Sequence, residues 1–203
     1  MATLKLRIVG LGDSTTAGTP GFLSPLEAPP NGRGNPESQY AYWMMKARPE
    51  WTVLNRGVNG QRSDEILARI QRNVLSESPN YVVILAGVND VYQGAPLESA
   101  KNHLLAMYEK ATAARIRTVT ATVLPYNTAS ASESEAIRDL NSWIADTANR
   151  LGLLFCDTNR AVRDPRNRDR LLSSPDGLHP DVSGYRKMGE ALAETIDSNA
   201  RLV

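Results

Sequence analysis

Residues 4–18 read LKLRIVGLGDSTTAG, a short apolar run that ends in a glycine-rich turn. The run Leu4–Val9 predicts a strand, because its apolar residues are large or β-branched. Gly12, Asp13 and Ser14 are common turn formers, so we expect the chain to leave the strand there. This turn would present a small hydroxyl group. It fits a phosphate cradle, an ordinary turn or a reactive serine.

The phosphate cradle lacks its defining residues. The GxGxxG fingerprint would need glycines at positions 10, 12 and 15, but residue 15 is threonine. The P-loop needs a Gly-Lys pair, and the sequence contains none. The GxSxG elbow fails as well, because Thr16 stands where its last glycine belongs. A nucleotide-binding α/β protein is therefore a weak alternative, and the choice lies between an ordinary turn and a reactive serine.

Apolar runs alternate with helical patterns along the rest of the chain. Continuous apolar strands between helices favour a parallel sheet that helices cover on both faces. In such sheets the ligand site lies beyond the carboxyl ends of the strands, where the turn at Ser14 would sit. The further strands are expected at Trp51–Leu54, Tyr81–Ala86, Ile116–Val123 and Leu153–Phe155. The helical stripes are Ile66, Ile70 and Val74; Ile137, Leu140, Ile144, Ala148 and Leu151; and Met188, Leu192 and Ile196.

Several short segments carry local signals. Helix starts are indicated by Asn35 before Pro36, by Ser63 before DEILARI, and by Ser132 with Glu135 three residues on. The Pro- and Gly-rich stretch 19–36 is long for a connection, so a functional rim loop or a flexible insert is expected. The arginine-rich stretch 163–170 also contains aspartates and is expected to be a solvated loop.

Composition restricts the class of protein. The 203 residues, 41% of them hydrophobic, are enough for one domain over residues 1–203. The formal net charge of +1 gives no field for nucleic acid or an anionic membrane, so neither a nucleic-acid partner nor stable membrane association is expected. Cys156 is the only cysteine, so an intrachain disulfide and a four-thiolate metal site are excluded. The first ten residues are too short and too charged for a signal peptide. A cytoplasmic enzyme is thus the default expectation, or a secreted one if a leader was removed.

A reactive serine needs a base, and the chain has two histidines. His103 falls about 100° from the centre of the apolar stripe of its helix, which indicates a surface or flank position. His179 stands in SPDGLHPDVSGY, three residues after Asp176. Residues three apart in one turn lie close together, so this carboxylate could orient the imidazole toward a serine. A loop histidine capped by its neighbour is an equal alternative.

Acyl transfer also needs donors for a developing oxyanion. Gly57 follows the second predicted strand and could present its backbone N–H closely, because it has no Cβ. Asn89 follows the third and could aim its side-chain amide at the same point. Each residue alone fits an ordinary turn. Both, however, would leave the sheet at the same edge as Ser14.

Four motifs together resemble the SGNH hydrolases, also called the GDSL esterase/lipase family. They are Gly12-Asp13-Ser14, Gly57 in NRGVNG, the run GVND at 87–90, and the run DGLHP at 176–180, in that order along the chain. The resemblance implies a flavodoxin-like three-layer α/β/α sandwich with a five-stranded parallel sheet. It implies Ser14 as nucleophile, His179 as base and Asp176 as its partner. It also implies an oxyanion hole of Ser14, Gly57 and Asn89, and neither a metal nor an organic cofactor.

The function expected from the sequence is that of a serine esterase. It would hydrolyse small carboxylic esters, with short acyl chains or O-acetyl groups, through an acyl-Ser14 intermediate. A carbohydrate O-acetyl esterase, a thioesterase and a catalytically silent ligand-binding module are the alternatives. Two departures from the family are Thr15, where an apolar residue is usual, and the long segment 19–36. Possible wall residues of the pocket are Phe22, Leu23, Leu26 and Tyr126.

Overall fold

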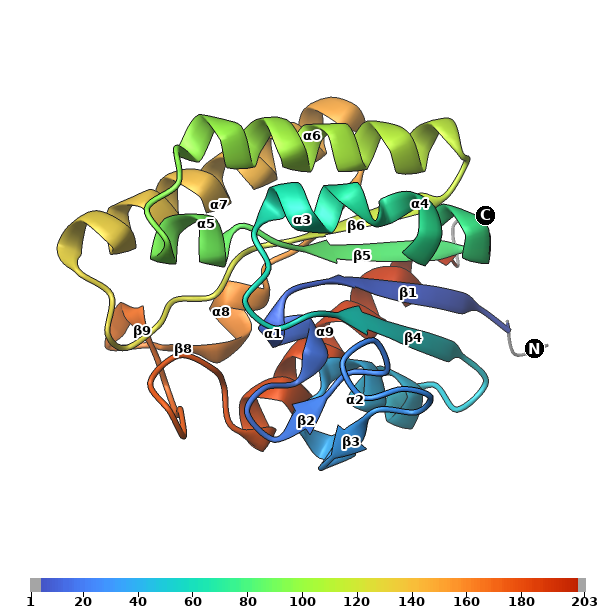
Figure 1. Cartoon of the computed structure of the whole chain (residues 1–203), viewed down its shortest axis with the longest axis horizontal. Helices are drawn as coiled ribbons and strands as arrows, with labels where there is room; N and C mark the ends of the chain where they lie inside the picture. The colour runs from blue at the N-terminus through green and yellow to red at the C-terminus, as the bar shows by residue number, and fades with distance from the viewer. Residues whose placement is uncertain (1–4, 201–203) are drawn as a thin grey trace.

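A five-stranded parallel sheet forms the centre of the protein, whose computed structural model describes residues 5–200 (Figure 1). The order across the sheet is β4-β1-β5-β6-β7, and every neighbouring pair is parallel. The five predicted strands are confirmed with ends shifted by a few residues, although Leu4 lies outside the described residues. The strands are β1 (Arg7–Gly12), β4 (Thr52–Gly57), β5 (Tyr81–Leu85), β6 (Arg117–Ala121) and β7 (Leu154–Cys156).

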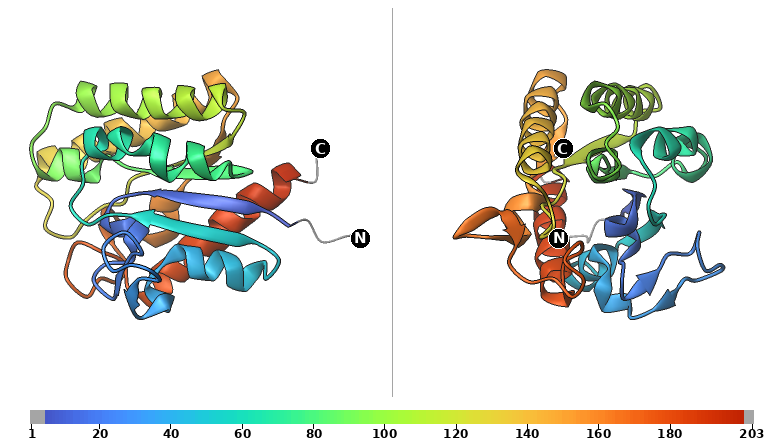
Figure 2. Two further views of the ribbon diagram at one scale, coloured as in Figure 1. Left: turned by 45° about the vertical axis from the view of Figure 1, so that its right-hand side comes forward. Right: turned by 60° about the vertical axis from the view of Figure 1, so that its left-hand side comes forward.

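Helices cover both faces of this sheet, which confirms the three-layer α/β/α sandwich (Figures 1 and 2). The helices α2 (Tyr40–Ala47) and α9 (Val182–Ala200) pack together on one face. The other face carries α3 (Ser63–Ala68), α4 (Ile70–Asn73), α6 (Leu97–Ala113) and α7 (Ala131–Leu151), as right-handed crossovers require. The shorter elements are α1 (Ser14–Ala17), η1 (Pro36–Ser38), η2 (Leu75–Glu77), α5 (Val88–Tyr92) and α8 (Thr158–Val162), with the hairpins β2 (Phe22–Leu23)–β3 (Arg33–Gly34) and β8 (Arg163–Asp164)–β9 (Asn167–Leu171).

Burial on both sides explains why the strands read as continuous apolar runs. Every residue of β5 is buried, and so is every residue of β1 after Arg7. The predicted helical stripes also face this core, except Leu151, which is exposed in the last turn of α7. Within residues 5–200, no helix is long and apolar enough to cross a membrane.

The register of the sheet brings three strand ends to one level. Gly12 at the end of β1 pairs with Gly57 at the end of β4 and with Leu85 at the end of β5. The segments that follow these three positions therefore leave the same edge side by side. Ser14 is two residues beyond the first end, and Asn89 is four residues beyond the third.

Two helix starts differ from the sequence-based expectation. The cap of α7 is Ser130 with Glu133, two residues before the predicted pair, and both halves of the capping box are present. Ser63 is the first residue of α3 rather than its cap, because its hydroxyl group bonds across to Asp90. The stripe that includes Ile66 and Ile70 is divided between α3 and α4, although these side chains share one buried face.

The two irregular stretches contain small hairpins. Segment 19–36 forms β2–β3 and packs on the loop after β4, where Ser24 Oγ donates to Gly57 O and Asn59 N donates to Glu27 Oε1 at 2.9 Å. Stretch 163–170, predicted to be a solvated loop, forms most of the hairpin β8–β9, none of its residues is buried, and Arg138 Nη1 lies 2.7 Å from Asp169 Oδ2.

Gly57 is required where the end of β4 touches α1. A Cβ at this position would overlap the backbone of Ala17, which cannot move aside as a flexible side chain can. Gly57→Ala should therefore lower the free energy of unfolding by about 2–4 kcal/mol, as overpacking does. Urea unfolding measures this loss. Gly94→Ala is the control, because Gly94 has positive φ but no atom near the added Cβ, so only backbone strain of about 1 kcal/mol is expected there. Equal losses in the two variants would contradict the packing role.

Candidate active site

The turn after β1 places Ser14 at the start of α1. Asp13 precedes this short helix and accepts the Thr15 N–H on Oδ1 at 2.9 Å, which holds the turn closed. Gly12 permits the approach, because a Cβ there would overlap Leu85 O and Thr16 Oγ1. The side chain of Ser14 is consequently fixed at the carboxyl edge of the sheet, where it is 5% exposed.

His179 reaches Ser14 from the loop before α9. Its Nε2 lies 2.8 Å from Ser14 Oγ, and its Nδ1 lies 2.7 Å from Asp176 Oδ2. An ionised carboxylate accepts hydrogen bonds only, so Nδ1 carries the proton and Nε2 is left to accept the serine hydroxyl proton. One direct hydrogen bond thus joins Ser14 and His179, which are 165 positions apart in the sequence.

Asp176 is held by the turn that it starts. Its Oδ1 accepts the backbone N–H groups of Leu178 at 2.9 Å and His179 at 2.8 Å. Partial burial raises the pKa of this carboxyl, but the hydrogen bonds from the His179 imidazole and from the two backbone N–H groups outweigh it and lower the pKa below its usual value. The carboxylate therefore stays ionised at neutral pH and fixes the orientation of the imidazole.

Gly57 does not offer a free N–H, contrary to the sequence-based prediction. This N–H is donated to the side chain of its near neighbour Asn55, at 2.9 Å from Oδ1. Gly60, three residues later, lies in the wall of the pocket beside Ser14. Within residues 5–200, its N–H has no hydrogen-bond partner, and the same holds for the N–H of Ser14.

Asn89 turns its side chain toward the same pocket from α5. One proton of Nδ2 goes to Gln61 O at 2.9 Å, which fixes the amide and leaves its second N–H available. Ser14 N, Gly60 N and Asn89 Nδ2 thus come from the three segments that leave the sheet at one level.

Arg69 ties the strand ends together beneath the site. It is 7% exposed and donates to Gly12 O and Arg56 O, both at 2.7 Å, and to Gln61 Oε1 at 2.6 Å. Burial lowers the pKa of this guanidinium to about 10, so it remains protonated at neutral pH. One cation therefore holds the ends of β1 and β4 and the loop that carries Gly60.

A cavity of about 200 Å³ opens at Ser14. Its wall is largely apolar, and the rings of Tyr92 and Tyr126 meet edge to face with centroids 5.6 Å apart. Tyr126 was among the predicted wall residues, whereas Phe22, Leu23 and Leu26 do not line the cavity. The lining residues are Ser14, Thr15, Asn59, Gly60, Val88, Asn89, Tyr92, Gln93, Leu124, Tyr126, Leu178 and His179.

The structure brings the predicted residues Ser14, His179 and Asn89 to one pocket, with Asp176 bonded to His179, and it adds Gly60, which the sequence analysis did not single out. The signal for Gly60 was its position: it stands in the same NRGVNG motif, in a loop long enough to reach past the strand end. His103 occupies the flank of α6, as predicted, where it is half-buried and contacts Ser63. Among residues 5–200, no group of three His, Cys, Asp or Glu side chains is placed to ligate a metal ion.

Comparisons with known proteins agree with this geometry. The model of the GDSL-like Lipase/Acylhydrolase family matches residues 11–187. A comparison with curated proteins finds no match. A G-D-S-L family protein from Desulfitobacterium hafniense is 25% identical, with a TM-score of 0.79 and coverage of 94% of this chain and 99% of the other.

Two further solved structures show the same fold. A GDSL-like lipase from Bacteroides thetaiotaomicron is 23% identical, with a TM-score of 0.77 and coverage of 98% of this chain and 93% of that one. Axe2, an acetylxylan esterase from Geobacillus stearothermophilus, is 20% identical, with a TM-score of 0.73 and coverage of 94% of each chain. At these identities the likeness concerns the fold alone.

Asp13 makes stability depend on pH. Burial raises the pKa of its carboxyl from 3.8 to about 6, although the Thr15 N–H and the nearby His179 both lower it. Within residues 5–200, its Oδ2 has no hydrogen-bond partner. A raised folded-state pKa gives stability that is fully present below pH 3.8 and is lost as the pH rises through 6. Asparagine does not titrate, so the free energy of unfolding of Asp13→Asn, relative to that of wild type, should rise by up to about 3 kcal/mol between pH 4 and pH 7. Urea unfolding at both pH values tests this, and a difference between the two proteins that does not change with pH would contradict it.

Proposed function

The chain belongs to the GDSL-like lipase/acylhydrolase family of carboxylic ester hydrolases, and on this premise we propose that it is a serine esterase acting on small esters through an acyl-Ser14 intermediate. The observation that carries the proposal is the continuous contact from Asp176 through His179 to Ser14, with the serine at the mouth of a cavity. Nucleophile, base and orienting acid are the three groups that acyl transfer by serine requires.

The reaction begins with proton transfer from Ser14 Oγ to His179 Nε2 as the oxygen attacks the ester carbonyl carbon. Asp176 stabilises the imidazolium that forms. The tetrahedral intermediate collapses when His179 gives this proton to the leaving alcohol, which leaves the acyl group on Ser14. Water then attacks the acyl-enzyme with His179 again acting as base, and Ser14 regains its proton as the acid leaves.

The oxyanion hole in this proposal consists of Ser14 N, Gly60 N and Asn89 Nδ2. Gly60 replaces Gly57, whose N–H is already donated to Asn55. The three donors need no rearrangement when negative charge develops, because α1, the loop after β4 and α5 already hold them. Such fixed donors stabilise the transition state more than the bound substrate.

The cavity favours a short acyl chain. Its volume of about 200 Å³ is below the 300–1,000 Å³ of pockets that hold drug-sized ligands. Tyr92, 52% exposed, and the amide side chains of Asn59 and Gln93 stand at its rim. An aromatic face beside amides suits a sugar ring, so O-acetylated carbohydrate is the second candidate substrate class, and the fold is shared with an acetylxylan esterase.

Removing the Asn89 amide tests the proposed function directly. Wild type should hydrolyse 4-nitrophenyl acetate, and Asn89→Ala should lower kcat by roughly 10²–10³ with little change in KM, because one oxyanion donor is lost. Ser14→Ala gives the background rate. No hydrolysis by the wild type would refute the esterase assignment, and an unchanged kcat in Asn89→Ala would remove this residue from the oxyanion hole.

Acyl chain length tests the size of the cavity. The value of kcat/KM should be highest for acetyl to butyryl 4-nitrophenyl esters and should fall by roughly tenfold or more for octanoyl, because a long chain exceeds the cavity. Equal or faster hydrolysis of the octanoyl ester would contradict the short-acyl proposal. Release of acetate from acetylated xylan, with a KM that Tyr92→Ala raises, would favour the carbohydrate class over simple esters.

A further inference from the structure

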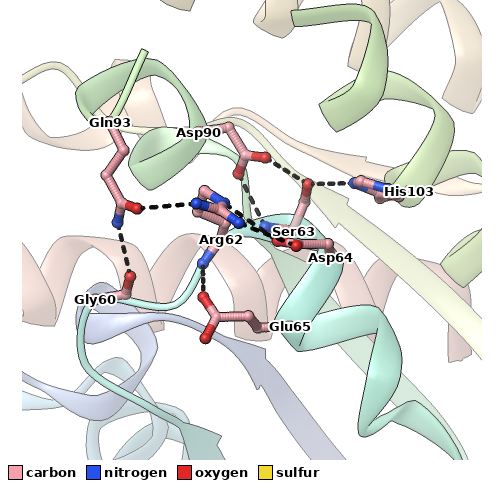
Figure 3. Close-up of polar contacts among 8 residues, drawn as sticks. All are labelled: Gly60, Arg62, Ser63, Asp64, Glu65, Asp90, Gln93 and His103. Atoms are coloured by element: carbon pink, nitrogen blue, oxygen red, sulfur yellow. Dashed lines mark hydrogen bonds and ion pairs between the residues drawn. The ribbon is translucent and has the colours of Figure 1, made fainter. Parts of the chain in front are cut away.

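Ser63, Asp90 and His103 form a second cluster of serine, aspartate and histidine, apart from the triad (Figure 3). Ser63 donates its N–H to Asp90 Oδ2 at 2.9 Å, and its Oγ lies 2.6 Å from Asp90 Oδ1. The same Oγ lies 2.9 Å from His103 Nδ1. Ser63 and Asp90 are buried, and His103 lies half-buried on the neighbouring helix α6.

The hydrogen bonds of this cluster have the opposite direction to those that a catalytic serine and its base need. The Ser63 hydroxyl has one proton, and the buried carboxylate of Asp90 accepts it. His103 must therefore donate its Nδ1–H to Ser63 Oγ, which is a lone-pair acceptor in that contact. Ser63 is 0% exposed, and its histidine is a donor rather than an acceptor toward the hydroxyl, so Ser63 is not a second nucleophile.

The cluster lies directly behind two of the proposed oxyanion donors. Ser63 follows the loop that carries Gly60, and Asp90 is the residue after Asn89. Two further contacts join the same segments: Gln93 Nε2 donates to Gly60 O at 3.0 Å, and Asn89 Nδ2 donates to Gln61 O at 2.9 Å (Figure 3 shows the first). The pair Ser63–Asp90 is the buried member of this set of contacts.

We propose that His103 is a positioning residue for the esterase reaction: through Ser63 and Asp90 it fixes the loop of Gly60 against the helix of Asn89, so that both oxyanion donors point at one atom. This inference rests on the proposed function of Ser14. The bond from His103 sets the rotamer of Ser63, whose hydroxyl group then bonds Asp90 in one geometry. Buried and fully bonded polar chains of this kind specify a single arrangement.

This hydrogen-bonded chain of His103, Ser63 and Asp90, called the brace below, should affect the transition state rather than the bound substrate. The distance between Gly60 N and Asn89 Nδ2 matters only when negative charge develops on the substrate oxygen, so a loosened brace should lower kcat and leave KM nearly unchanged. Complete loss of one donor costs 10²–10³, and imperfect placement of both should cost roughly tenfold.

The variants separate hydrogen bonding from packing. His103→Leu removes the donor. His103→Asn keeps an N–H near the position of Nδ1 and should therefore retain kcat. Ser63→Ala breaks the chain at its centre, so the double variant Ser63→Ala/His103→Leu should be no slower than Ser63→Ala alone. Asn102→Leu, at the exposed neighbouring position on α6, is the matched control.

Kinetics are measured with 4-nitrophenyl acetate well below the melting temperature of the least stable variant. His103→Leu should lose roughly tenfold in kcat at constant KM, while His103→Asn and Asn102→Leu stay within about twofold of wild type. A normal kcat in His103→Leu, the same loss in Asn102→Leu, failure of His103→Asn to rescue, or additive losses in the double variant would overturn the proposal.

Hydrogen exchange of the Ser63 amide gives a readout that does not need turnover. This N–H is protected by Asp90, and His103→Leu should accelerate its exchange while Asn102→Leu leaves it unchanged. If the wild type hydrolyses no ester, the proposed function fails, and unaltered Ser63 exchange in His103→Leu then overturns the brace separately.

Discussion

The pairing of Gly12 with Gly57 on one side and with Leu85 on the other is the constraint from which the site follows. In a parallel sheet, in-register strand ends emerge at the same level, so short segments after them meet without long loops. Ser14 and Asn89 are close because each is only a few residues beyond a strand end. Glycine at positions 12 and 57 lets the turn, the neighbouring strands and α1 approach to contact distance.

Buried charges then hold this edge in one arrangement. Arg69 binds three oxygens from the ends of β1 and β4 and from the loop after β4. Asp13 closes the turn at Ser14, and Asp90 joins α5 to the start of α3. Burying such groups costs free energy unless hydrogen bonds compensate. Asp13 retains an unbonded buried oxygen and a raised pKa, so part of this cost remains in the folded protein beside Ser14.

The fold was predictable because its signals are local and repeated. Apolar runs alternating with helical stripes are enough to indicate a parallel sheet covered on both faces, and the i, i+3 spacing of Asp176 and His179 indicates their contact. The position of Ser130 as the cap of α7, rather than Ser132, was less accessible, because neighbouring serines carry equal local signals and only the geometry of the preceding chain selects one.

Two hydrogen-bond contacts at the site could not be predicted from the sequence, for a common physical reason. Gly57 and Gly60 stand in one motif, and which N–H is free depends on the side chain of Asn55, whose contact cannot be read from spacing. His103 lies off the apolar stripe of α6, as expected, yet that flank faces Ser63 rather than water. In both cases the polar side chain has a partner that is set by tertiary packing.

The central claim is that Ser14 becomes covalently acylated. The most direct measurement is peptide mass mapping of wild type mixed with excess 4-nitrophenyl acetate and quenched in acid during turnover. The account predicts one acetyl group on the peptide that contains Ser14, absent from Ser14→Ala treated in the same way. Rapid turnover with no adduct on that peptide, or an acetyl group on another residue that persists in Ser14→Ala, would contradict it.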